Sequence, residues 1–89
     1  MLNPSYRSAF KKDIKLAKKR GLNLQTLATV ITWIVEEQSL PESLRNHKLV
    51  GEWVGRLECH LAPDWLLIYK IDGENVIFER TGTHADLFE

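Results

Sequence analysis

The hydrophobic pattern of the chain changes its period once, and this change constrains the fold more than any other feature. In the first 35 residues, apolar side chains recur every three or four positions, as in amphipathic helices. From Trp53 onward they alternate with polar side chains, as in strands that are covered on one face. A chain of 89 residues with 44% hydrophobic content can build one modest core. We therefore expect a single α+β domain over residues 1–89, with a helical hairpin packed on one face of a small antiparallel sheet.

The N-terminal part predicts the helical hairpin. Ser5 or Ser8 can cap a first helix, which Gly21 ends. Asn23 can cap a second helix, which ends before Pro41. The apolar faces consist of Tyr6, Phe10, Ile14 and Ala17 in the first helix and of Leu24, Leu27, Ala28, Ile31, Ile34 and Val35 in the second. Such wide stripes are typical of a buried core rather than of a ligand groove.

Three main strands are expected after the hairpin, over residues 53–61, 65–71 and 76–81. A turn at Ala62-Pro63 joins the first two, and a turn at Asp72-Gly73 joins the last two. Thr83 can then cap a short C-terminal helix that runs through Phe88, with Asp86 three residues on as in a capping box. Pro4 limits any N-terminal edge strand to residues 1–3.

The predicted turns gather polar residues at one end of the sheet. A two-residue turn at Ala62-Pro63 places His60 opposite Trp65, and a two-residue turn at Asp72-Gly73 places Trp65 opposite Arg80. A longer loop at residues 72–75 would place Arg80 opposite Leu67, on the same face. In either register we expect His60, Trp65 and Arg80 to share a face, with Asp64 and His84 close by. The helices would then cover the opposite face, which is formed by Leu57, Cys59, Leu61, Leu66, Ile68 and Ile77.

Charge and cysteine content indicate the compartment. The formal net charge is zero, but residues 1–20 carry seven basic side chains and only one acid, Asp13. Such a segment is typical of a solvated helix face, or of a surface for phosphate or an acidic partner. The longest apolar stretches fall well short of the ~20 residues that cross a bilayer, and no signal-peptide core is present. Cys59 is the only cysteine, so an intramolecular disulfide is impossible. We expect a cytoplasmic protein without a membrane partner.

Several motifs together resemble a known family. Residues 58–70 combine a strand that carries a histidine with a Pro-Asp-Trp turn, and residues 80–84 read Arg-Thr-Gly-Thr-His. These motifs resemble the YafQ branch of the RelE-type bacterial toxins. Residues 46–53 are similar to the loop that leads into the sheet of that family, and residues 12–18 are similar to its first helix. The resemblance covers nearly the whole chain.

The resemblance implies a ribosome-dependent endoribonuclease that cuts mRNA in the ribosomal A site. It also implies a cognate antitoxin that holds the enzyme inactive, binding to operator DNA only through that antitoxin, and chemistry without a metal ion or cofactor. The 2′-OH of the substrate would serve as the nucleophile. The functional positions of the family fall on His47, His60, Asp64, Trp65, His84 and Phe88.

Acid/base chemistry is consistent with these residues. In-line attack by a 2′-OH needs one group to take its proton and another to protonate the leaving oxygen, and histidine can do both near neutral pH. We expect His84 to be the general acid and His60, oriented by Asp64, to be the base, with His47 holding the phosphate or sharing either role. Arg80 would neutralise charge on the phosphorane.

Some of these residues also allow other interpretations. Trp65 or Phe88 would stack on a splayed base or position it. Cys59, His60, Asp64 and His84 include residue types that bind zinc, but strand alternation points Cys59 away from His60. A further alternative is a catalytically inactive member of the family that acts with its antitoxin in transcriptional autoregulation.

Overall fold

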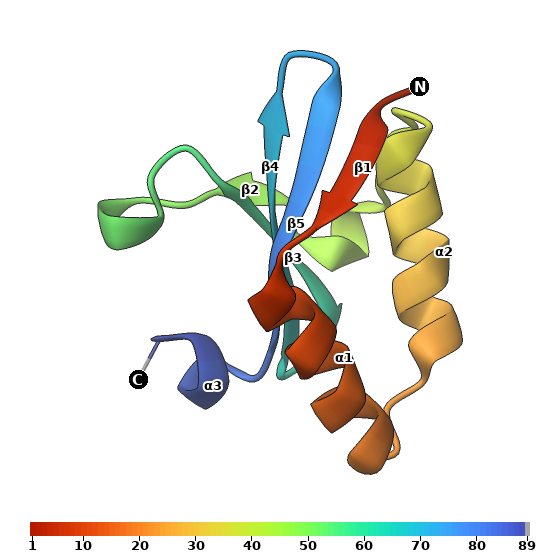
Figure 1. Ribbon diagram of the computed structural model, residues 1–89, viewed down its shortest axis with the longest axis vertical. Helices are drawn as coiled ribbons and strands as arrows, with labels where there is room; N and C mark the ends of the chain where they lie inside the picture. Colours follow the sequence, from red (N-terminus) through yellow and green to blue (C-terminus); the bar gives the residue numbers. More distant parts are fainter. Residues whose placement is uncertain (89) are drawn as a thin grey trace.

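The computed structural model describes residues 1–88 and shows a five-stranded sheet flanked by helices (Figure 1). The chain begins with β1 (Asn3–Tyr6), α1 (Ser8–Lys19) and α2 (Leu24–Val35). It continues through two short 3-10 helices, η1 (Glu42–Leu44) and η2 (Gly51–Trp53), which flank β2 (His47–Lys48). It ends with β3 (Leu57–Ala62), β4 (Trp65–Asp72), β5 (Asn75–Gly82) and α3 (His84–Phe88). The strand order is β1-β5-β4-β3-β2, and only β1 runs parallel to its neighbour. The expected α+β class is confirmed.

The helical hairpin is confirmed, with one correction at its start. Asn23 caps α2, since its side chain accepts a hydrogen bond from the Gln25 amide at 3.0 Å. Gly21 follows α1 with a φ of +75°, a conformation that favours glycine after a helix. The expected serine cap on α1 is wrong. Arg7 occupies the cap position without a side-chain bond, and Ser8 is already the first helical residue.

The edges of the sheet differ from the prediction. β1 includes Pro4 and extends to Tyr6. Proline lacks a backbone N–H, but an edge strand tolerates this loss because one of its sides makes no hydrogen bonds to a neighbouring strand. β2 adds a second edge, where His47 lies opposite Glu58. Trp53 is not in a strand. It belongs to η2, and Gly55, with a φ of +88°, separates it from the start of β3.

Two β-bulges change the predicted register. Leu61 is an extra residue between His60 and Ala62, so His60 lies opposite Leu66 instead of Trp65. Asp72 lies opposite Asn75, which confirms the longer of the two predicted loops. A second bulge on β5 then places Arg80 opposite Ile68. Consequently Arg80 shares the His60 face of the sheet, whereas Trp65 lies on the opposite face.

The register determines which side chains meet the helices. Leu57, Cys59 and Leu61 of β3 face the hairpin as predicted. On β4 and on the first half of β5 the predicted faces are wrong, because a one-residue shift exchanges the two sides of a strand. The hairpin instead covers Trp65, Leu67, Tyr69, Val76 and Phe78, together with Phe10 and Leu27. The second bulge restores the predicted face at Arg80. Leu66 and Ile68 form a second, smaller core with Leu87 of α3, Leu49 and Trp53.

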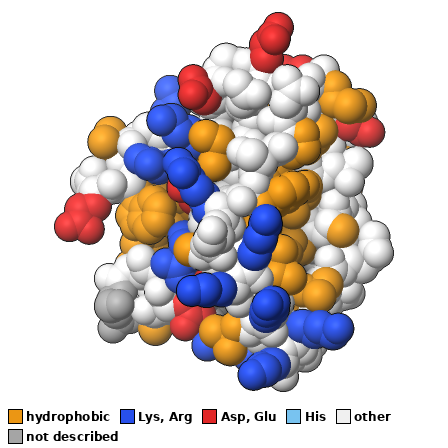
Figure 2. Space-filling model, viewed as in Figure 1, with side chains coloured by type: hydrophobic (Ala, Val, Ile, Leu, Met, Phe, Trp, Pro, Cys, Tyr) orange, Lys and Arg blue, Asp and Glu red, His pale blue; other side chains and the backbone are white. Residues whose placement is uncertain are grey.

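The basic N-terminal segment is only partly neutralised by ion pairs. Arg7 pairs with Glu79, Arg20 with Asp86, and Asp13 with Arg80. Lysine side chains on α1 add to the Lys and Arg surface that Figure 2 shows over this helix and the adjoining sheet. Among residues 1–88, none of the helices combines the length and the apolar character that a membrane crossing requires.

Candidate active site

The three histidines form a row across one end of the sheet. The ring centroids of His47 and His60 are 6.0 Å apart, and those of His60 and His84 are also 6.0 Å apart. The rings come from β2, β3 and the first residue of α3, so three segments distant in sequence build the row. His60 and His84 line a groove of about 550 Å³, together with Ser43, Leu44, Arg45, Leu61, Ala62 and Pro63.

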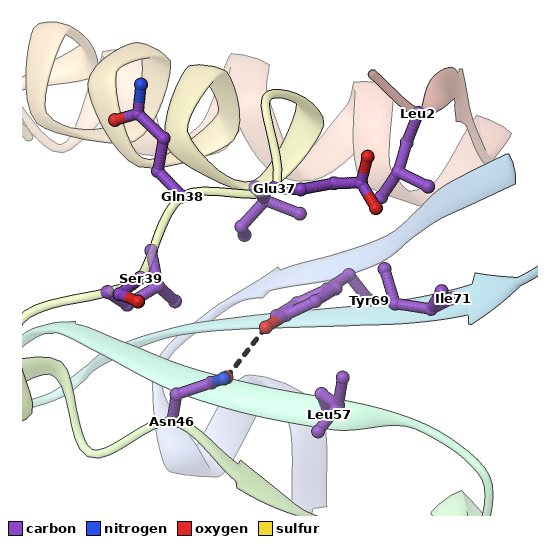
Figure 3. Close-up of a pocket in the computed structure, with 10 residues that line it drawn as sticks. Leu2, Glu37, Gln38, Ser39, Asn46, Leu57, Tyr69 and Ile71 are labelled. Atoms are coloured by element: carbon purple, nitrogen blue, oxygen red, sulfur yellow. Dashed lines mark hydrogen bonds between the residues drawn. The ribbon is translucent and has the colours of Figure 1, made fainter. Parts of the chain in front are cut away.

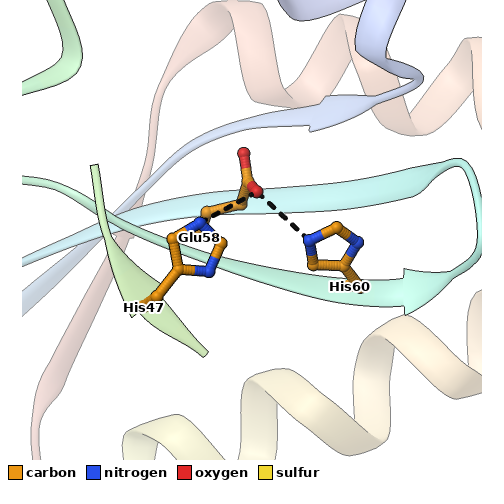
Figure 4. Close-up of side chains that lie close together, drawn as sticks. All are labelled: His47, Glu58 and His60. Carbon is orange, nitrogen blue, oxygen red and sulfur yellow. Dashed lines mark ion pairs between the residues drawn. The ribbon is translucent and has the colours of Figure 1, made fainter. Parts of the chain in front are cut away.

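A buried carboxylate lies between two of the imidazoles (Figure 4). The Oε1 atom of Glu58 is 3.4 Å from Nε2 of His47 and 3.3 Å from Nε2 of His60. The Glu58 side chain is only 6% exposed, compared with 18% for His60 and 48% for His47. A carboxylate withdrawn from water needs compensating positive charge, and the histidines are the groups that face it here. Glu58, rather than Asp64, is therefore the carboxylate next to His60, since Asp64 bonds to His84.

The backbone before β2 fixes His47. The carbonyl of Arg45 lies 2.6 Å from Nδ1 of His47, and Arg45 itself has a left-handed φ of +50°. Since a carbonyl oxygen can only accept, Nδ1 carries the proton of this bond. Tyr69 secures the same segment, because its hydroxyl donates to Oδ1 of Asn46 at 2.7 Å (Figure 3). Burial raises the pKa of Tyr69 to about 12, so this donor keeps its proton.

Asp64 holds the third histidine. Its Oδ1 atom accepts both the backbone N–H of His84 at 3.0 Å and the Nδ1 proton of the same residue at 2.7 Å. These bonds, first the backbone and then the side-chain one, hold the pKa of the Asp64 carboxyl below its usual value. The pair is open to solvent, with 53% of the His84 side chain and 63% of the Asp64 side chain exposed.

The start of α3 is fixed by the predicted capping box. The Asp86 amide donates to the Thr83 hydroxyl at 3.1 Å, and the Thr83 amide donates to Asp86 at 2.9 Å. Arg20, which caps the end of α1, adds a bidentate bond to the same carboxylate, and this bond holds the pKa of Asp86 well below its usual range. A Cβ at Gly82 would lie 2.9 Å from Oδ2 of Asp86, so only glycine fits beside this carboxylate without displacing it. His84 thus sits on a well-anchored helix start.

One predicted site residue, Trp65, lies elsewhere, and so does Cys59 of the alternative zinc set. Trp65 is 4% exposed and packs in the core beneath the hairpin, so its ring is not available to stack on a base. Cys59 is fully buried on that same side, and burial raises the pKa of its thiol to about 12. A protonated thiol is a poor metal ligand. The structure therefore does not assemble the zinc set of Cys59, His60, Asp64 and His84.

Arg80 lies on the site face but is already engaged. Its Nε and Nη2 atoms donate to the two carboxylate oxygens of Asp13 at 2.7 and 3.1 Å. Nη1 takes no part in these two bonds. Asp13 also accepts a hydrogen bond from the Thr81 amide at 3.0 Å. This bond satisfies a backbone N–H of β5 that lies beyond the residues paired with β1.

An aromatic pair, exposed Phe88 and half-buried Trp53, continues the histidine row. The Phe88 ring is 6.4 Å from the His84 ring and 6.4 Å from the Trp53 ring, which it meets edge-on. Phe88 is 43% exposed, and with Trp53 it lines a hollow of about 440 Å³. Phe88 therefore lies next to His84 at the end of the histidine row.

Two residues at the site were not predicted. Glu58 could have been found from its two-residue spacing to His60, since alternate residues of a strand share a face. Trp53 could not, because the alternating pattern assigned it to a strand and the 3-10 turn that carries it leaves no clear sequence signal.

Comparison with known proteins gives the family. The family model for YafQ, described as a bacterial toxin of type II toxin-antitoxin systems, matches residues 2–89. The chain therefore belongs to the YafQ family of bacterial toxins. It is 42% identical over 84 residues to the mRNA interferase toxin YafQ of Escherichia coli K12, covering 93% of this chain and 91% of that protein.

Solved structures agree with this assignment. YafQ in the DinJ-YafQ complex of Escherichia coli superposes with a TM-score of 0.93 at 39% identity, covering all of both chains. A metal-bound toxin from Helicobacter pylori superposes with a TM-score of 0.92 at 36% identity, covering 99% of this chain and all of that one. Both matches extend over the sheet, the hairpin and the C-terminal helix.

Proposed function

We propose that this toxin is a cytoplasmic mRNA interferase that cleaves mRNA in the ribosomal A site without a metal ion. The observation that carries the proposal is the row of three imidazoles, spaced 6.0 Å apart and oriented by two carboxylates. This arrangement offers both a proton acceptor and a proton donor beside one groove. The name of the Escherichia coli relative, an mRNA interferase toxin, supports the same activity.

His60 serves as the general base in this mechanism. With the Nε2 proton directed at Glu58, Nδ1 keeps its lone pair and takes the proton of the 2′-OH. The 2′-oxygen then attacks the adjacent phosphorus in line with the 5′-oxygen. His47, on the other side of Glu58, supplies positive charge next to the phosphate when it is protonated.

His84 serves as the general acid. Asp64 accepts its Nδ1 proton, so Nε2 is the atom that delivers a proton to the leaving 5′-oxygen as the P–O5′ bond breaks. The products are a 2′,3′-cyclic phosphate and a 5′-hydroxyl end. Arg80 would contact the phosphate through its free Nη1, and Phe88 would position a base by stacking.

Partner binding follows from the family. We propose a cognate antitoxin, as in the DinJ-YafQ complex of the relative, and contact with operator DNA only through that antitoxin. The alternative function is an inactive module that pairs with its antitoxin in autoregulation. The carboxylate on each of two histidines favours the enzyme, since a binding module has no need to orient them.

The chemical groups at the ends of the cleaved mRNA test the proposal. After brief induction without antitoxin, mRNA should carry new 5′-hydroxyl ends paired with 2′,3′-cyclic or 3′-phosphates, detected by ligation methods specific for each end. The His84→Ala variant, expressed equally, provides the control. Normal growth with intact mRNA and preserved antitoxin binding would instead support the inactive module. Recovery of 5′-phosphate and 3′-hydroxyl ends would indicate attack by water.

A further inference from the structure

The cluster of His47, Glu58 and His60 has the geometry of a metal site. Its ligand atoms all lie within 4.8 Å of one another. A tetrahedral zinc ion with Zn–N and Zn–O bonds of about 2.0–2.2 Å has its ligand atoms about 3.3–3.5 Å apart. The two measured separations, 3.3 and 3.4 Å, fall within that range. They are long for hydrogen bonds between nitrogen and oxygen.

The proton on His47 strengthens this reading. Nδ1 donates to the Arg45 carbonyl, so a neutral His47 directs the lone pair of Nε2 toward Glu58. Two electron pairs then face each other across 3.4 Å, beside a carboxylate that is 6% exposed. This contact is favourable only with a cation, which is either a proton on Nε2 or a metal ion between the groups. The Arg45 carbonyl also supplies the outer-shell bond that usually orients a metal-bound histidine.

We propose that His47, Glu58 and His60 bind one divalent transition-metal ion, with Zn²⁺ fitting best, and that its occupancy switches off the ribonuclease. Imidazole and carboxylate ligands suit this class of ion. Three protein ligands leave the fourth tetrahedral position to water or to a phosphate oxygen.

Inhibition follows from the tautomer of His60, and this half of the proposal rests on the proposed function. When Nε2 of His60 binds the metal, the proton of the neutral ring resides on Nδ1. Nδ1 then has no lone pair with which to accept the 2′-OH proton. The metal also takes the carboxylate of Glu58 away from its orienting role. The base is therefore lost while His84 is left unchanged, because Asp64 holds it separately.

Zinc binding is tested without reference to activity. Isothermal titration of the metal-free protein with Zn²⁺ should give one site per chain, and Co²⁺ should give the strong visible absorption of a tetrahedral complex. Glu58→Gln and His47→Ala should each weaken zinc binding by more than about 100-fold, since even outer-shell changes cost 10–100-fold. The exposed position of His47 makes the second variant safe for folding. His84→Ala is the matched control and should bind zinc as tightly as the parent.

Cleavage is then measured on ribosome-bound mRNA with chelator or with zinc. Cleavage by the parent should fall in proportion to site occupancy and return when zinc is removed. The ratio of rates with and without zinc should stay near one for His47→Ala, which controls for effects of zinc on the ribosome. Absence of binding, or equal binding by Glu58→Gln, overturns the site. Cleavage that rises with zinc overturns the inhibition. Zinc binding by a chain that never cleaves RNA would sustain the site and refute the proposed function.

Discussion

The site contains two histidine-carboxylate pairs, and they differ in their surroundings. Glu58 is buried in the sheet and His60 is half-buried beside it, with side chains 6% and 18% exposed. His84 and Asp64 stand in solvent, with side chains 53% and 63% exposed. A charge is screened weakly in the first environment and strongly in the second. The less exposed pair is therefore suited to hold a base, His60, in a fixed orientation. In the exposed pair, the acid function depends more on the His84 imidazole than on the Asp64 carboxylate.

Loss of the acid should have the largest effect. Replacing His84 by alanine is expected to lower single-turnover cleavage by roughly 10²–10⁴, the usual contribution of a general acid. Folding should be unaffected, because the helix start is held by Thr83, Asp86 and Arg20. The measurement is cleavage of ribosome-bound mRNA, with thermal unfolding as the folding check. A rate within a few-fold of the parent would assign the acid elsewhere.

Loss of the buried carboxylate should have an intermediate effect. Glu58→Gln keeps the shape but removes the carboxylate charge that lies 3.3 Å from Nε2 of His60, an interaction worth ~1.5–3 kcal/mol, so cleavage should fall about 10- to 100-fold. The matched control is Glu74→Gln, at an exposed position in the turn between β4 and β5, which should keep the parental rate. A Glu58→Gln enzyme as active as this control would show that burial adds nothing to the orientation of His60.

Loss of the exposed carboxylate should have the smallest effect. Asp64→Asn is expected to lower cleavage only a few-fold, since exposed ion pairs contribute little and an amide oxygen can still accept the His84 backbone N–H. A loss as large as that of Glu58→Gln would abolish the distinction between the two pairs.

The titration of Asp64 sharpens the same comparison. Carboxyl ¹³C shifts followed by NMR should give a pKa below the ordinary value of 3.8, because His84 donates twice to the carboxylate. The folded-state value is lower than the unfolded one, so the stabilising contact is present above that ordinary value and is lost as the pH falls through the folded pKa. His84→Ala removes the side-chain donor and should raise the Asp64 midpoint. An unchanged midpoint in that variant would mean that the backbone bond alone causes the shift.

The sequence predicted which segments form helices and strands better than it predicted which face of each strand is buried. The helical hairpin, the end of its first helix before Gly21, the cap at Asn23 and the capping box at Thr83 were all correct, because each depends on neighbouring residues. The faces of β4 and of the first half of β5 were wrong, because one extra residue at Leu61 decides the pairing and leaves no local signal. The face of Arg80 was right, because the second bulge reverses the shift.

The residues of the candidate site also divide into those that sequence patterns placed correctly and those that they did not. His60 and His84 could be placed near each other from strand and turn patterns, and motif resemblance added His47. Trp65 was misplaced by the register error. Glu58 was overlooked because, on the sequence alone, an acidic residue in a strand is more often a solvated side chain than a buried one.

By itself, the sequence determined the α+β class, the hairpin, the C-terminal cap and the supply of histidines, since periodicity and capping are local properties of the chain. Only the tertiary structure decided that Glu58 lies between two imidazoles, that Asp64 serves His84, and that Trp65 belongs to the core. These outcomes depend on how β2, β3 and β4 align, and that alignment is set by bulges and by packing between segments far apart in the chain.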